Sequence, residues 1–489
     1  MNPLFQISSR QLRRDTQRAS ILTLVARSME YLFQFAGLAV LARLLTPSDF
    51  GLYAMATPFL MIVKHFSDLG LEAALLQQRD LSEGHASAVF QVNLLAGLAF
   101  AGLFLVVSPL LGSFYQDHRV TSIAAVLSLT FVISGFTAVQ RALLRRALLF
   151  DVLLRAQIAA SAVSIVVAII FALNGAGYWA LIARALADPV TYAIFVWSSS
   201  GWVPGRAEWD RTTKFLLRFG RYYIGAGLVW SLGTQADSVL IGWRFGSVEL
   251  GPYTLASRLF ALPVGQISSP LGHVMVPALS RIRDDPERFK RWYLKVLGLM
   301  TFVAFPPSFS LVFCADDVVR FVAGPQWDKA ADILRVLAPL GAVFAAYVTI
   351  DWLMRSQGHA DRVFRWTIIS TTAHLASFVL GLPWGAIGVA AGFTAVNLLL
   401  FVPAFVYAIR GTSIQLMDVL KAMLPSAALM IVTTGAVYAL RTFLAEEWHP
   451  ILRLLATGVV IAATMACGIA LVYGRSLLGG RWWTLEEAP

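Results

Sequence analysis

Pairs of opposite charge at helical spacing lie inside long apolar runs of this sequence. Three such pairs, spaced three or four residues apart, are Arg27 with Glu30, Lys64 with Asp68, and Arg184 with Asp188. This spacing puts both members of a pair on one helix face, where the acid can neutralise the cation. Charge at membrane depth is costly and is kept there for a reason. Each pair is therefore either a structural ion pair or a cation that its acid releases to an anionic ligand, since Arg binds phosphate oxygens through paired hydrogen bonds.

Two further charges have no opposite charge at helical spacing within their own apolar run. Asp237 lies toward the end of one run, and Arg258 lies near the start of the next. A helical hairpin would bring them together, so an Asp237–Arg258 bridge is one interpretation. The substrate-binding cations that we expect are Arg27, Lys64, Arg184 and Arg258, and the coupling or gating acids are Glu30, Asp68, Asp188 and Asp237.

We find no signature of catalysis in the sequence. It has no Gly-rich loop ending in Lys-Ser or Lys-Thr to cradle ATP phosphates, which excludes a built-in ATPase. Asp284-Asp285 suggests a metal–nucleotide-sugar site but stands in a basic connector without a domain around it. Cys314 and Cys467 are too few for a disulfide framework and lack metal-ligand spacing. We expect no catalytic residue, no metal and no cofactor.

The elements that carry these charges are membrane-spanning helices. The sequence has 489 residues, of which 58% are hydrophobic and 14% charged, and its mean hydropathy is +0.69. A soluble domain carries roughly 25% charged residues and could not keep this much apolar surface from water. The composition excludes a cytoplasmic enzyme, a disordered chain and a secreted disulfide scaffold, and it predicts an all-α polytopic membrane protein. The net charge of +11 is typical of the positive-inside rule rather than of nucleic-acid binding.

Apolar windows between charged or Pro/Gly-rich turns predict about fourteen spans. They lie near residues 19–42, 50–72, 86–111, 120–140, 157–174, 178–198, 222–243, 252–278, 291–314, 332–354, 363–381, 385–409, 419–440 and 451–473. Lys and Arg concentrate before the first span and in every second loop, and the positive-inside rule places that side in the cytoplasm. An even number of spans puts both termini there. The outer loops include 315–331, which carries Asp316, Asp317 and Asp328.

An internal repeat divides the spans into two halves. Residues 44–56 align without gaps on residues 244–256, with the matching positions Asp49/Glu249, Phe50/Leu250, Gly51/Gly251, Tyr53/Tyr253 and Ala56/Ala256. A second pair of turns agrees, Gly177-Tyr-Trp-Ala and Gly385-Ala-Ile-Gly. The repeat unit covers six spans, so both copies have the same membrane orientation. A pseudo-twofold axis along the membrane normal should relate them, with any cargo path between them.

In these motifs the chain resembles the bacterial polysaccharide flippases of Wzx type. Residues 41–56 (LARLLTPSDFGLYAMA) and 66–79 (FSDLGLEAALLQQR) are similar to the opening of these proteins. Residues 237–242 (DSVLIG) and 250–256 (LGPYTLA) resemble the start of their second lobe. The family belongs to the multidrug/oligosaccharidyl-lipid/polysaccharide (MOP) exporter superfamily. The likeness covers most of the chain in span count and lobe order, and its sharp motifs mark turns and helix packing.

The resemblance implies a MATE-like MOP flippase fold with two pseudo-symmetric six-helix lobes around a central cavity and two C-terminal helices beside them. The boundaries that we expect are 1–18 for a cytoplasmic basic N-terminus, 19–198 for the first lobe, 199–221 for a cytoplasmic connector, 222–409 for the second lobe, 410–473 for the last two spans and 474–489 for a cytoplasmic tail. The implied activity is alternating-access flipping of undecaprenyl-diphosphate-linked oligosaccharide units to the periplasmic leaflet of the inner membrane. This step serves exopolysaccharide, capsule or O-antigen (lipopolysaccharide) biosynthesis. The candidate cations would bind the diphosphate.

Two other functions remain open. A cation-coupled multidrug exporter of the same superfamily would need an acid-rich cavity, and the balance of cations and acids here favours an anionic cargo. A membrane polysaccharide polymerase or glycosyltransferase would show a large outer loop or a cytosolic domain, and every predicted loop is short. Export of a peptidoglycan precursor is an option within the leading class. The expected partners are the lipid-linked oligosaccharide, membrane lipid, and a polymerase with its export machinery, without nucleic acid.

Overall fold

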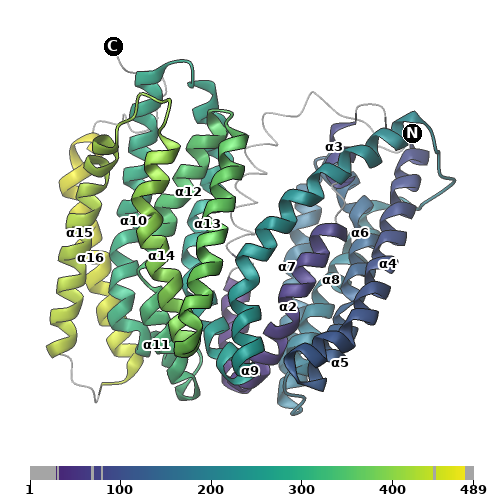
Figure 1. The fold of residues 1–489 in the computed structure, drawn as a ribbon, viewed down its shortest axis with the longest axis horizontal. Coiled ribbons are helices and arrows are strands. Elements are labelled where there is room, and N and C mark those ends of the chain that lie inside the picture. Colours follow the sequence, from purple (N-terminus) through teal and green to yellow (C-terminus); the bar gives the residue numbers. More distant parts are fainter. Residues whose placement is uncertain (1–28, 30–31, 68–70, 79–80, 444–447, 479–489) are drawn as a thin grey trace. The chain divides into compact units, whose positions relative to one another are not determined.

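The computed structural model describes residues 29, 32–67, 71–78, 81–443 and 448–478, and within these ranges every regular element is a helix. The chain divides into two compact units, Met1–Thr254 and Leu255–Pro489, which are described separately. Within each unit the long helices run side by side (Figure 1). This is the packing that a lipid environment requires, because a helix satisfies its own backbone hydrogen bonds.

The first unit is built from the earlier helices of the chain. They are an apolar segment Leu32–Leu44, α2 (Pro47–Ser67), α3 (Leu71–Gln77), α4 (Glu83–Tyr115), α5 (His118–Leu127), α6 (Leu129–Arg146), α7 (Phe150–Leu173), α8 (Trp179–Ser200) and most of α9 (Arg211–Arg281). The second unit begins within α9. It continues with α10 (Pro286–Val322), η2 (Pro325–Trp327), α11 (Asp328–Leu337), α12 (Leu340–Ser356), α13 (Ala360–Gly381), η3 (Leu382–Trp384), α14 (Gly385–Ala408), α15 (Leu416–Phe443) and α16 (Pro450–Leu478).

The predicted all-α membrane architecture is confirmed. Among the described residues, 8 helices are long and apolar enough to cross a membrane, or up to 9 if the bent pair Pro325–Leu337 and Leu340–Ser356 forms one span. The count of about fourteen spans stays a prediction. The spans predicted at 222–243 and 252–278 lie in α9, which consists of two helices that meet at a non-helical residue, Gly246, where φ is 76° and ψ is −170°. Glycine adopts this left-handed backbone without the steric cost that a side chain would add.

Capping residues fix where the helices start. The Ser82 hydroxyl accepts a hydrogen bond from the His85 backbone N–H (3.1 Å), and His85 Nδ1 accepts one from the Ser82 N–H (3.2 Å). Asp117 caps α5, and Asp285 caps α10 directly before Pro286. Such caps satisfy the N–H groups that the first helical turn leaves unpaired.

Close helix approach depends on glycine in both units. A Cβ added at Gly97 of α4 would lie 2.6 Å from the carbonyl oxygen of Phe131 in α6. In the second unit, a Cβ at Gly392 of α14 would lie 2.6 Å from the Ser377 carbonyl oxygen in α13. Membrane helices use small residues in this way, because packing rather than the hydrophobic effect holds them together.

The segment between α8 and α9, inside the range predicted as a connector, lies on the first turn of α4. Trp202 is buried next to Phe90, with ring centroids 6.2 Å apart. The Glu208 backbone N–H donates to the Gly84 carbonyl oxygen (3.1 Å). These contacts hold the segment to the first unit.

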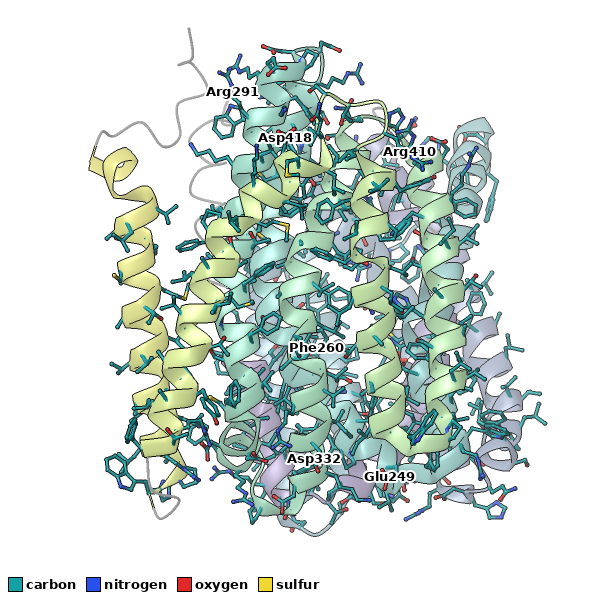
Figure 2. All side chains as sticks on the ribbon, turned by 60° about the vertical axis from the view of Figure 1, so that its left-hand side comes forward. Glu249, Phe260, Arg291, Asp332, Arg410 and Asp418 are labelled. Atoms are coloured by element: carbon teal, nitrogen blue, oxygen red, sulfur yellow. The ribbon has the colours of Figure 1, made fainter. Side chains whose placement is uncertain are left out.

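Charged residues mark both ends of the second unit. Figure 2 shows Arg291, Arg410 and Asp418 at one end of the helices, Asp332 at the other, and Phe260 between them. A polar group at each end with an apolar belt between is what a membrane-spanning bundle requires.

Candidate functional site

Several of the charges named from the sequence are not placed by the structure. Arg27, Glu30 and Asp68 lie outside the described residues. Lys64 belongs to α2, but its side chain is not among those described. The roles of these residues stay predictions.

Arg184 and Asp188 lie one helical turn apart on α8. Both are half-buried, and neither residue is without an interaction partner. Their position on one helix face follows from the spacing. Binding of an anion at this face stays a prediction.

Asp237 is the candidate acid with the best-defined surroundings. Its Oδ2 accepts a hydrogen bond from the Tyr253 hydroxyl at 2.6 Å, and its Oδ1 accepts one from the Ser238 backbone N–H at 2.6 Å. Tyr253 is buried. Because Gly246 separates Asp237 from Tyr253, this contact ties together the two helical stretches of α9. The sequence reveals Tyr253 as a repeated position and gives no indication that it binds Asp237.

Arg258 was the predicted partner of Asp237. It is half-buried on the part of α9 that belongs to the second unit, whereas Asp237 belongs to the first. The Asp237–Arg258 bridge stays a prediction.

A cluster that sequence reasoning missed joins α3 to the end of α6. Glu72 Oε2 accepts a hydrogen bond from Arg141 Nε at 2.8 Å, and Glu72 Oε1 lies 2.6 Å from Arg145 Nη1. The buried Arg146 donates to the carbonyl oxygens of Leu75 and Gln78. Arginine outnumbers acid here, and the cluster adds charged hydrogen bonds to a short helix whose Leu71, Ala74 and Leu75 are buried in the core.

A polar link connects three helices inside the second unit. Asn397 Nδ2 donates to the Phe393 carbonyl oxygen (2.8 Å), which leaves Asn397 Oδ1 facing His374 Nε2 at 3.3 Å. An amide oxygen only accepts, so His374 carries its proton on Nε2. The Tyr347 hydroxyl donates to the Asn397 carbonyl oxygen (3.1 Å). Buried polar groups of α12, α13 and α14 therefore satisfy one another.

A buried carboxylate holds the last two helices on α10. Asp317 Oδ2 lies 2.6 Å from Arg441 Nη1 of α15, and Asp317 Oδ1 lies 2.8 Å from Arg453 Nη2 of α16. We expected Asp317 in an outer loop, but α10 continues to Val322 and carries it into the packed region. In the described part of the chain, no group of three or more His, Cys, Asp or Glu side chains could hold a metal ion.

Sequence comparison identifies relatives of this chain. Residues 40–332 match the sequence model of the family described as polysaccharide biosynthesis protein. The teichuronic acid biosynthesis protein TuaB of Bacillus subtilis (strain 168) is 26% identical over 348 residues, which are 68% of this chain and 70% of TuaB. The lipopolysaccharide biosynthesis protein WzxC of Escherichia coli (strain K12) is 23% identical over 370 residues, 74% of each chain.

Solved structures share the fold. The lipid II flippase MurJ in its inward closed conformation has a TM-score of 0.74 at 17% identity, over 94% of this chain and 100% of that one. An inward-facing MATE family multidrug transporter of the MOP superfamily has a TM-score of 0.64 at 16% identity, over 84% of this chain and 98% of the other. The expected fold class is thereby confirmed. Because the family model matches more than half of the sequence, this chain belongs to the polysaccharide biosynthesis protein family, with the fold of the MOP superfamily transporters.

Proposed function

We propose that this protein is a multi-pass transporter of the bacterial inner membrane that flips undecaprenyl-diphosphate-linked oligosaccharide repeat units from the cytoplasmic to the periplasmic leaflet. The observation that carries the proposal is the family match over 40–332, a range that contains both of the repeated motifs, 44–56 and 244–256. The relatives are named for polysaccharide biosynthesis, and MurJ is named as a flippase of lipid II. A flippase that supplies lipid-linked sugars for exopolysaccharide, capsule or O-antigen would have a role in polysaccharide biosynthesis, as the relatives' names state, and a transport activity like the one for which MurJ is named.

Flipping breaks no covalent bond, so the protein's task is electrostatic. A charged, hydrated diphosphate-sugar head must cross about 30 Å of hydrocarbon while the lipid tail stays in the bilayer. Cationic side chains in a water-filled cavity would replace the hydration of the diphosphate. The cations to which we assign this role are Arg27, Lys64, Arg184 and Arg258. Half-burial of Arg184 and Arg258 supports the assignment, because neither residue lies fully on the outside of its helix bundle.

The acids Glu30, Asp68, Asp188 and Asp237 are assigned to coupling or gating. Asp237 supports this role best, because the hydrogen bond that it accepts from Tyr253 spans the interruption of α9 at Gly246. A change in its protonation would alter a contact between two helical stretches. Since the sequence has no ATP-binding loop, an ion gradient or removal of the delivered cargo would drive transport.

We place both termini in the cytoplasm on the basis of the positive-inside rule. The position of Arg291 and Arg410 at one end of the second unit supports a basic side (Figure 2). The undecaprenyl carrier and the surrounding lipid are the immediate partners. A polysaccharide polymerase with its export machinery would consume the flipped unit.

The proposal is tested in cells that lack the gene. They should accumulate lipid-linked repeat units on the cytoplasmic side and make no polymer, and the wild-type gene should restore polymer. A change in drug resistance with normal polymer would instead indicate a multidrug exporter.

Variants of the candidate cations sharpen this test. Arg184→Gln and Arg258→Gln should insert normally and lose polymer export, because each removes a diphosphate ligand. The control is Arg155→Gln, since the Arg155 side chain is 76% exposed and pairs with Asp151 in its own helix turn. Export retained in both test variants would assign Arg184 and Arg258 to structure.

A further inference from the structure

The two copies of the sequence repeat meet in the structure at their equivalent glycines, Gly51 and Gly251. A Cβ added at Gly51 would lie 1.9 Å from the carbonyl oxygen of Ser247, and a Cβ added at Gly251 would lie 1.8 Å from the carbonyl oxygen of Pro47. At the repeat offset, Pro47 corresponds to Ser247 and Gly51 to Gly251. The contact is therefore reciprocal: each copy presents a glycine to the same carbonyl of the other.

Helix starts create this contact in both copies. α2 begins at Pro47, and α9 resumes its helix after the interruption at Gly246, next to the start of α2 (Figure 1). The Ser48 and Ser247 hydroxyls lie 2.9 Å apart across the contact. All of these residues belong to the first compact unit.

Because the contact is reciprocal, it lies on the pseudo-twofold axis that relates the two copies of the repeat. A patch in which position i touches position j and j touches i is isologous, and an isologous contact lies on the twofold axis that relates its halves. In transporters built from repeats, the cargo path follows the interface between the repeats. The turns between the first two spans of each copy are also the ones that the charge pattern puts on the outer side.

We propose that this reciprocal glycine contact, formed by Pro47, Ser48, Gly51, Ser247 and Gly251, is a latch that closes the outer end of the cargo path and separates during each transport cycle. The inference rests on the proposed transport function. The contact consists of backbone atoms and one hydroxyl pair, so its separation exposes groups that water can hydrogen-bond and leaves no charge unpaired. Glycine allows the closed state, because any side chain at either glycine position would hold the two turns apart.

A reversible crosslink tests the latch. We would introduce Ser48→Cys and Ser247→Cys together after replacing both native cysteines (Cys314→Ala, Cys467→Ala). A hydroxyl separation of 2.9 Å brings two thiols close enough to form a disulfide on oxidation. Flipping in proteoliposomes should fall in proportion to the crosslinked fraction and return when the disulfide is reduced.

A matched pair controls for crosslinking as such. Thr433 of α15 and Thr464 of α16 also place two hydroxyls 3.0 Å apart, and they lie away from the repeat motifs. Thr433→Cys with Thr464→Cys should oxidise equally well and leave flipping unchanged. Flipping that continues in the oxidised Ser48→Cys/Ser247→Cys protein would overturn the latch.

A second measurement needs no cargo and keeps the two proposals separable. In the reduced Ser48→Cys/Ser247→Cys protein, a membrane-impermeant thiol reagent added outside should label the thiols with time, because the latch opens. Gly51→Ala should speed this labelling by preventing closure, whereas Gly102→Ala should not, since no atom lies within 4 Å of a Cβ added at Gly102. Labelling without any flipping by the wild type would refute the flippase proposal alone. Flipping without labelling would refute the latch alone.

Discussion

Replacing Asp317 by Asn should loosen the last two helices from the second unit. The Asp317 side chain is 1% exposed and faces Arg441 and Arg453, whose side chains are 18% and 13% exposed. The amide keeps the shape of the carboxylate but removes the negative charge that both guanidiniums share. Two mostly buried cations would then face each other without an anion between them.

The expected loss follows from the burial of this ion triad. Removing one partner of a buried ion pair costs about 3–5 kcal/mol, because the remaining charge stays desolvated. We expect a loss in this range for Asp317→Asn rather than twice as much, since both arginines share one carboxylate and their effects are not additive. The measurement is the free energy of unfolding by denaturant of the protein in mixed micelles.

The neighbouring acid provides the control. Asp316 pairs with Arg335 at 2.6 Å, but the two side chains are 47% and 40% exposed. Asp316→Asn should therefore cost at most about 1 kcal/mol, as is typical of exposed ion pairs. Equal losses for the two substitutions would refute the argument from burial.

The polar contacts of Asp237, Glu72 and Asp117 can each be tested by a single substitution. Tyr253→Phe removes the hydroxyl that donates to Asp237 and should lower the free energy of unfolding by about 1–3 kcal/mol, measured in the same micelles. Glu72→Gln weakens the attachment of α3 to α6 and should speed hydrogen exchange within α3. The Arg119 side chain hydrogen-bonds Asp117 and lowers the pKa of its carboxyl, so this carboxylate stabilises the fold above its unfolded pKa of about 3.9. That contribution disappears as the pH falls through the lower folded pKa, and Asp117→Asn should remove this part of the pH dependence of unfolding.

Tyr53→Phe changes the equivalent tyrosine of the first copy, and a loss as large as that of Tyr253→Phe would mean that the Asp237 contact is not the cause. Asp151→Asn breaks an exposed pair and should leave exchange in α3 unchanged. A stability difference between wild type and Asp117→Asn that persists undiminished at the lowest pH would contradict the assigned linkage.

Sequence patterns predict the architecture well because the bilayer constrains it strongly. Long apolar windows must form helices in lipid. The window at 86–111 lies inside α4, and the window at 157–174 ends one residue after α7. Hydropathy places breaks less well. Its turn near residue 246 agrees with the break at Gly246, where two helices of α9 meet, but it predicts a loop at 315–331, where α10 continues to Val322.

The polar contacts were largely beyond the reach of sequence patterns. Helical spacing detects partners three or four residues apart, but Glu72 and Arg141 are separated by 69 residues, and Asp317 and Arg441 by 124. Only tertiary packing brings such residues together. The repeat was the exception, because matching Gly51 with Gly251 identified two positions whose turns meet in the fold.

Flipping by the purified protein in sealed proteoliposomes tests the central claim most directly. Undecaprenyl-diphosphate-linked oligosaccharide would be incorporated in both leaflets, and the outward-facing fraction would be followed with an enzyme that cannot cross the membrane. The proposed function predicts that wild-type protein makes the inner pool accessible, whereas empty vesicles and vesicles with Arg184→Gln protein keep it protected. An inner pool that stays protected with wild-type protein, under an imposed ion gradient and with matched native lipid-linked oligosaccharide, would contradict the claim.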